Sequence, residues 1–189
     1  GHWCELLCPL FCVQSLNLFR YIRRTPAAGK TMSPDLPQIF VAIGANLASP
    51  RFGAPPGSFA AALDLLGADG IEIVRVSRWY RSPPLPPSAQ PHYINGVIAV
   101  RSGRSPEELL SRLHRVEGAF GRVRGERNAA RSLDLDLLAY SDTVIAGGAG
   151  GLEVPHPRLS ERAFVLLPWA ELSPAWRHPL SGLTVAEMI

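Results

Sequence analysis

Two aspartates separated by one residue are the clearest candidates for chemistry in this sequence. Asp134 and Asp136 alternate with leucines in the run 133–137, and alternate side chains of a β-strand share one face. We therefore expect the leucines to face the core and both carboxylates to face the other way. A cation that prefers oxygen ligands, most simply Mg²⁺, would relieve the repulsion between the carboxylates. A strand with a solvated polar face is compatible with the same pattern.

A cluster of arginines comes directly before this acidic strand. Its four members lie within ten residues and are Arg122, Arg124, Arg127 and Arg131. A guanidinium binds phosphate through two parallel hydrogen bonds, and a metal ion together with arginines neutralises the charge of a transferring polyphosphate. The loop alone could also be a solvated basic surface. Together with the acidic pair, it predicts a site for a metal-bound polyphosphate such as that of ATP.

Two further groups could contact a substrate. His156 stands between two prolines and is followed by Arg162, while Tyr93 and Asn95 follow a loop over 81–92 that contains five prolines. A tyrosine ring can stack on a flat ligand, and an asparagine amide offers a donor and an acceptor to its edge. Each group also has an ordinary structural interpretation, as a buried histidine or as a strand aromatic beside a polar neighbour.

Several enzyme classes are excluded by what the sequence lacks. It contains no GxxxxGK[ST] motif, no kinase glycine-rich loop with its catalytic partners and no nucleophile elbow. The formal net charge of +3 lies entirely in residues 1–31, whereas residues 32–189 carry 15 basic and 15 acidic residues. Such a balanced body gives no general attraction for a long polyanion.

The elements that must position these residues follow from hydrophobic patterning. Strands are expected over 38–44, 71–80, 93–100 and 132–140, and helices over 58–66, from Ser105 to Phe120, and over 161–169 up to Pro168. Ser58 is the expected N-cap of the first helix, and Ser105 with Glu108 forms the capping box of the second. Leu109, Leu110, Leu113, Val116 and Phe120 form its expected buried stripe. The irregular order of helices and strands predicts an α+β fold with a mostly antiparallel sheet.

One domain over 37–189 is expected after an N-terminal extension, 1–36, of foreign or upstream origin and poor order. All three cysteines, Cys4, Cys8 and Cys12, lie in this extension. The body therefore has no disulfide framework, which favours a reducing, cytoplasmic location. The apolar start is interrupted by polar residues and falls short of the roughly 20 apolar residues of a membrane span.

From Ile39 onward the sequence resembles the 6-hydroxymethyl-7,8-dihydropterin pyrophosphokinase family of folate biosynthesis (2-amino-4-hydroxy-6-hydroxymethyldihydropteridine diphosphokinase). The resemblance rests on the order and spacing of weak motifs, which are Ala42–Leu47, Tyr80–Leu85 with Gln90–Pro91 and Tyr93–Asn95, Glu117 before Gly121–Arg124, Arg131–Asp136, and Val154–His156 followed by Arg162 and Phe164. It implies a three-layer α/β/α sandwich with a ferredoxin-like core. The implied enzyme is a Mg-dependent diphosphokinase that transfers pyrophosphate from ATP to the pterin hydroxymethyl group and releases AMP.

The resemblance also implies roles for individual residues. Asp134 and Asp136 would hold two Mg²⁺ ions, with Arg122 and Arg131 as catalytic partners. The pterin would contact Ser82, Pro83, Leu85, Tyr93, Asn95 and Phe164, and ATP would contact Glu117, Arg122, Arg124, Arg127, Arg131, His156 and Arg162. The loops 81–92 and 122–131 would close over the site. The chain departs from many members in Arg127-Asn-Ala-Ala-Arg131 and in Pro157.

Two rival functions use the same residues. Another metal-dependent transferase with an acidic DxD pair would need the same charges, and a ferredoxin-like sheet with a basic loop could bind RNA without catalysis. The acidic pair beside the arginines and the absence of an aromatic RNA-binding motif disfavour RNA. A monomer acting on ATP and the pterin, with no nucleic-acid or membrane partner, is the expected form.

Overall fold

A computed structural model of the protein describes residues 39–122, 130–148 and 151–189. The expectations for the N-terminal extension and its cysteines, and for Arg124, Arg127 and Asn128, lie outside the described residues. Within them, no helix has the length and apolar character needed to cross a membrane.

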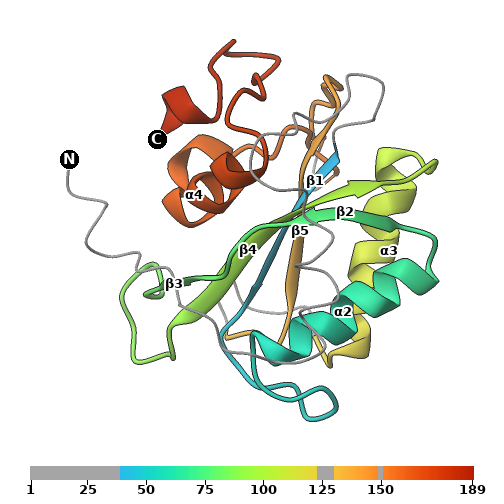
Figure 1. Ribbon diagram of the computed structural model, residues 1–189, viewed down its shortest axis with the longest axis vertical. Coiled ribbons are helices and arrows are strands. Elements are labelled where there is room, and N and C mark those ends of the chain that lie inside the picture. Colours follow the sequence, from blue (N-terminus) through green and yellow to red (C-terminus); the bar gives the residue numbers. More distant parts are fainter. Residues whose placement is uncertain (1–38, 123–129, 149–150) are drawn as a thin grey trace.

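Five strands of the described residues form one antiparallel sheet (Figure 1). Their bounds are β1 Ile39–Ala45, β2 Glu72–Val76, β3 Tyr80–Ser82, β4 Tyr93–Arg101 and β5 Asp134–Tyr140. The spatial order is β2-β4-β1-β5, with the short β3 also paired to β4. The predicted antiparallel sheet is confirmed, and β5, which carries both aspartates, lies at its edge.

In the same described ranges, three helices cover the two faces of this sheet. They are α2 Gly57–Ala68, α3 Pro106–Ala119 and α4 Ala163–Leu172, with short 3₁₀ turns η1 Leu159–Glu161 and η2 Ala186–Met188. The chain order β1-α2-β2-β4-α3-β5 is the ferredoxin-like βαββαβ arrangement. Helices α2 and α3 lie on one face and α4 on the other (Figure 1). The expected three-layer α/β/α sandwich is confirmed.

Strand alternation divides the core into two layers. Leu133, Leu135 and Leu137 belong to the layer under α2 and α3, as predicted. Phe40 and Leu138 belong to the layer under α4. The register between β1 and β5 shifts at Phe40 and Val41, which leaves Leu138 without a partner on β1, as in a β-bulge. Asp134 and Asp136 share the α4 side of β5, beyond the part that α4 itself covers.

The capping box of α3 is confirmed, but the start predicted for α2 is wrong. The Ser105 hydroxyl accepts the Glu108 N–H at 3.3 Å, and the Glu108 carboxylate accepts the Ser105 N–H at 3.2 Å. Helix α2 instead begins at Gly57 with Pro56 as N-cap. Ser58 therefore lies inside the helix, where its buried hydroxyl has no partner among the described residues.

Two other predicted elements differ in the structure. The strand expected over 71–80 divides into β2 and β3, because Ser77 bonds to Val97 through both its backbone and its hydroxyl, and the Trp79 ring then lies against Gly96. Helix α4 continues through Pro168 to Leu172 instead of ending at the proline. Burial of Pro168, Trp169 and Leu172 offsets the missing backbone hydrogen bond.

Candidate functional site

A cavity of about 330 Å³ opens on the α4 side of the sheet. Its lining includes all six residues predicted to contact a pterin, namely Ser82, Pro83, Leu85, Tyr93, Asn95 and Phe164. Four predicted phosphate or metal residues also line it, namely Arg131, Asp134, Asp136 and Arg162. Residues that are distant in sequence but predicted to share one site are thus brought to one cavity.

The floor of the cavity is built from small residues of the central strand β1. Gly44 pairs with Asn95 of β4 on one side and with Asp134 of β5 on the other. Ala42 likewise stands opposite Asp136. Because these positions carry little or no side chain, the space between the amide of β4 and the carboxylates of β5 stays open. Sequence reasoning assigned no role to this floor.

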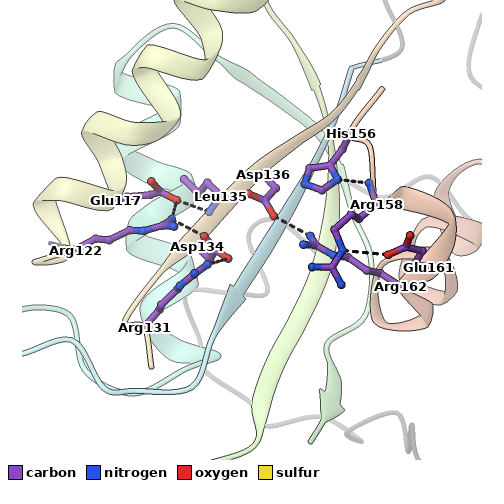
Figure 2. Close-up of polar contacts among 10 residues, drawn as sticks. All are labelled: Glu117, Arg122, Arg131, Asp134, Leu135, Asp136, His156, Arg158, Glu161 and Arg162. Carbon is purple, nitrogen blue, oxygen red and sulfur yellow. Dashed lines mark hydrogen bonds and ion pairs between the residues drawn. The ribbon is translucent and has the colours of Figure 1, made fainter. Parts of the chain in front are cut away.

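Both aspartates pair with arginines (Figure 2). The Asp134 carboxylate pairs with Arg122 and, at 2.6 Å, with Arg131. Asp136 pairs with Arg162 at 3.2 Å. Burial is the largest single influence on the pKa of Arg131 and lowers it, but the charge of Asp134, the hydrogen bond to Asp134 and the smaller effects of Tyr93 and Asp136 together raise it. The site therefore holds charges of both signs within hydrogen-bonding reach, which suits a polyanion bound together with cations.

The opposite wall of the cavity is aromatic and apolar. Tyr93 lies at the start of β4 and Phe164 in the first turn of α4. The guanidinium carbon of Arg162 lies 5.9 Å from the centre of the Phe164 ring, so the charged and aromatic parts of the site adjoin. Burial also raises the pKa of the Tyr93 hydroxyl, and Arg131 opposes the rise.

Glu117 lies behind the site and does not line the cavity. Its side chain is on α3 and only 2% of the residue is exposed. One carboxylate oxygen accepts the Leu135 N–H at 2.7 Å and also pairs with Arg122 (Figure 2). Burial raises the pKa of Glu117 to about 7, against the opposing effects of the Leu135 N–H and Arg122. The expected contact with ATP stays a prediction, whereas its hold on the edge strand β5 is a role that sequence reasoning missed.

His156 also lies beside the cavity and does not line it. Its backbone N–H donates to the Leu138 carbonyl at 2.9 Å, at the bulge of β5. Its Nδ1 accepts the Arg158 N–H at 3.1 Å (Figure 2). Burial lowers the pKa of His156, and the charge of Asp136 opposes this. Its expected contact with ATP stays a prediction.

Asn46, directly after β1, joins two walls of the site. Its Oδ1 accepts the Arg131 N–H at 2.7 Å, and its Nδ2 donates to Gln90 Oε1 at 3.1 Å and to the Pro91 carbonyl at 3.2 Å. The buried side chain thereby connects the proline-rich loop to the segment that enters β5. A polar residue immediately after a fully apolar strand is the sequence signal for such a role.

A cavity that joins carboxylates, arginines and an aromatic wall on a ferredoxin-like sheet is typical of an enzyme acting on a small phosphorylated molecule. The model of the 7,8-dihydro-6-hydroxymethylpterin-pyrophosphokinase family matches residues 40–174. The chain therefore belongs to this family.

Several proteins of similar sequence are named as pyrophosphokinases of this kind. A 2-amino-4-hydroxy-6-hydroxymethyldihydropteridine pyrophosphokinase from Synechocystis is 46% identical over 120 residues, which are 64% of this chain and 60% of that protein. The enzyme of that name from Pseudomonas aeruginosa is 40% identical over 143 residues, 75% of this chain and 84% of the relative. One from Methylorubrum extorquens is 34% identical over 151 residues, 79% of this chain and 90% of the relative.

Proposed function

We propose that this chain transfers the terminal pyrophosphoryl group of ATP to the hydroxymethyl group of 6-hydroxymethyl-7,8-dihydropterin and releases AMP, as a step of folate biosynthesis. Family membership supports the reaction. The single observation that carries it to this chain is one cavity lined on one side by Tyr93, Asn95 and Phe164 and on the other by Asp134, Asp136 and arginines. A flat ring and a polyphosphate fit these two sides.

The aromatic side would hold the pterin. Tyr93 and Phe164 would stack on the two faces of the ring. Asn95 and Ser82, with the backbone near Pro83 and Leu85, would bond to its polar edge. The hydroxymethyl group would then point along the floor toward β5. Holding both substrates in this geometry converts a bimolecular reaction into a step within one complex.

The acidic side would hold magnesium. Asp134 and Asp136 offer oxygen donors from one face of one strand, and phosphate oxygens and water would complete the coordination, as is usual for Mg²⁺. The residues present fit this metal, and we propose two ions. When bound, they would neutralise charge on the triphosphate. Arg131, Arg162 and Arg122 would bind the oxygens that remain.

The covalent step is a displacement at the β-phosphorus of ATP. The hydroxymethyl oxygen forms a bond to this phosphorus, the bond from it to the oxygen bridging to the α-phosphorus breaks, and AMP leaves with that oxygen. The hydroxyl proton passes to solvent or to a phosphate oxygen. The two carboxylates at the cavity are paired with arginines, so the chain contributes positioning and charge neutralisation more than proton abstraction.

The decisive experiment incubates purified protein with ATP, Mg²⁺ and 6-hydroxymethyl-7,8-dihydropterin. Mass spectrometry and ³¹P NMR should detect AMP and a pyrophosphorylated pterin in equal amounts. Omission of the pterin should abolish AMP formation, and EDTA should do the same. Formation of ADP in place of AMP, or equal turnover with a nucleotide sugar, would contradict the proposal and favour another DxD-type transferase.

We also propose that the enzyme acts as a monomer in the cytoplasm and needs neither nucleic acid nor a membrane. The lack of cysteine after residue 12 suits a reducing compartment. The paired acidic and basic groups at the cavity suit a small charged substrate better than a nucleic-acid backbone. Light scattering of the active protein at several concentrations tests the monomer.

A further inference from the structure

Going deeper into the proposed function, on which this rests, we infer that Ser82 and Gly44 are positioning residues that fix the orientation of the Asn95 amide. They do so from opposite sides, so that the amide oxygen of Asn95 is presented to a ligand N–H. The specificity of the site for the edge of the ring would then depend on Ser82 and Gly44, which neither stack on the ring nor bind phosphate.

Ser82 holds the nitrogen end of the amide. Asn95 Nδ2 donates to the Ser82 hydroxyl oxygen at 2.8 Å. Both residues are nearly buried, with 7% of Asn95 and 5% of Ser82 exposed. Ser82 is on β3 and Asn95 on β4, and these strands pair antiparallel. Tyr80 stands directly opposite Asn95, so Ser82 lies two residues further along β3 and reaches the amide diagonally. Since the hydroxyl oxygen accepts this bond, its own proton remains able to donate.

Gly44 leaves room for the oxygen end. It pairs with Asn95 across β1 and β4, and a Cβ added to Gly44 would lie 2.8 Å from Asn95 Oδ1. Real Cβ atoms do not approach so closely, and the oxygen can occupy this position only because residue 44 has no side chain.

The pair thus presents a fixed pattern at the cavity, since Asn95, Ser82 and Gly44 all line it. Asn95 Oδ1 is an acceptor and the Ser82 hydroxyl is a donor. A heterocycle whose edge carries an N–H beside an acceptor matches this pattern. A ring with the reverse order would leave two acceptors or two donors facing each other, which is costly when buried. If the Asn95 amide were free to rotate, the site would bind rings with either order of donor and acceptor on this edge.

A double-mutant cycle on Ser82 and Asn95 tests the inference. S82A should raise the KM for the pterin about three- to tenfold, as expected for one lost hydrogen bond, with the KM for ATP little changed. In an N95A background, S82A should raise the pterin KM by less than it does in the wild type, because only the direct hydrogen bond from the Ser82 hydroxyl is then lost and no amide remains to be positioned. G44A should raise the pterin KM in the same way as S82A.

Matched controls come from the opposite face of the sheet. Within the part of the chain that the structure describes, S58A removes a buried serine hydroxyl that has no partner, and G67A adds a methyl where nothing lies within 4 Å. Both should leave every kinetic constant unchanged. If S82A is silent, or if it costs as much in N95A as in the wild type, Ser82 does not act through Asn95 and the inference fails.

An NMR measurement keeps this result separate from the reaction itself. The Asn95 side-chain amide signals, assigned by their loss in N95A, should exchange slowly with solvent in the wild type and faster in S82A. In G44A their chemical shifts should change. If the wild type forms no AMP, the proposed function fails, while the NMR result still decides whether Ser82 and Gly44 hold the amide. Signals that do not respond to either substitution would overturn the inference.

Discussion

Glu117 offers a sharp test, because its placement suggests a different role from the contact with ATP that the family resemblance implies. Replacing it with alanine removes the acceptor of the Leu135 N–H and one partner of Arg122. Leu135 lies between the two aspartates on an edge strand, so within the described ranges its N–H has no neighbouring strand to bond on that side. We expect Glu117→Ala to destabilise the fold and to shift Asp134 at the same time.

The size of the effect follows from burial. A buried N–H left without a partner costs about 1–3 kcal/mol. For a domain of this size each 1 kcal/mol lowers Tm by about 2–4 °C, so the melting temperature should fall by about 2–12 °C. A loss of about 1.4 kcal/mol in the transition state would lower kcat about tenfold. Differential scanning fluorimetry and steady-state kinetics measure the two effects.

Glu117→Gln is the control that separates the two roles. The amide oxygen of glutamine can still accept the Leu135 N–H, and an uncharged group resembles the protonated form that burial favours. We expect most of the stability to return, with the KM for ATP close to that of the wild type. If glutamine is as destabilising as alanine, the hydrogen-bonding argument is wrong. If glutamine restores stability but raises the KM for ATP, the contact with ATP is real.

Four other substitutions test three separate features of the protein. Asp134→Ala and Asp136→Ala should each abolish Mg²⁺-dependent AMP formation while the circular dichroism spectrum is kept, and near-normal turnover in either would refute the metal assignment. Ser105→Ala should lower stability by about 1 kcal/mol through loss of the capping box, seen as a lower Tm with unchanged kcat. Tyr80 donates to the Glu171 carboxylate, and burial, followed by that bond, raises its pKa to about 12. Because the folded-state pKa lies above the ordinary value, the stability that the Tyr80 hydroxyl provides is complete below pH 10 and is lost toward pH 12. The difference in unfolding free energy between wild type and Tyr80→Phe should therefore narrow above pH 10, and a constant difference would contradict the shift.

Local signals in the sequence predicted much of the fold. The alternation of leucine and aspartate over 133–137 placed three side chains in the core and two at the cavity, because the period of a strand leaves no other choice when one face is buried. The capping box at Ser105 fixed the start of α3 for a similar reason, since its hydrogen bonds form within one turn. The prediction that the residues of the cavity belong to one site came mainly from the family resemblance.

The errors arose where contacts distant in sequence decide the structure. Pro168 does not end α4, because packing against the sheet outweighs one missing hydrogen bond. Ser58 is a good capping residue by type, but the N-cap of α2 is Pro56, two residues earlier. Glu117 follows Leu113 by four positions on the apolar stripe of α3, and only the position of β5 reveals what its carboxylate bonds to.

The alternation of leucine and aspartate along β5 has a consequence for how the protein folds. Since side chains alternate, a slip of β5 by one residue against β1 would bring Asp134 and Asp136 into the apolar layer under α2 and α3 and expose the leucines that alternate with them. Placing two carboxylates in that layer would cost far more than a misplaced ladder of hydrogen bonds. The two aspartates proposed to bind metal therefore also disfavour the wrong strand register. Substituting both with apolar residues should make misfolding more frequent as well as remove activity.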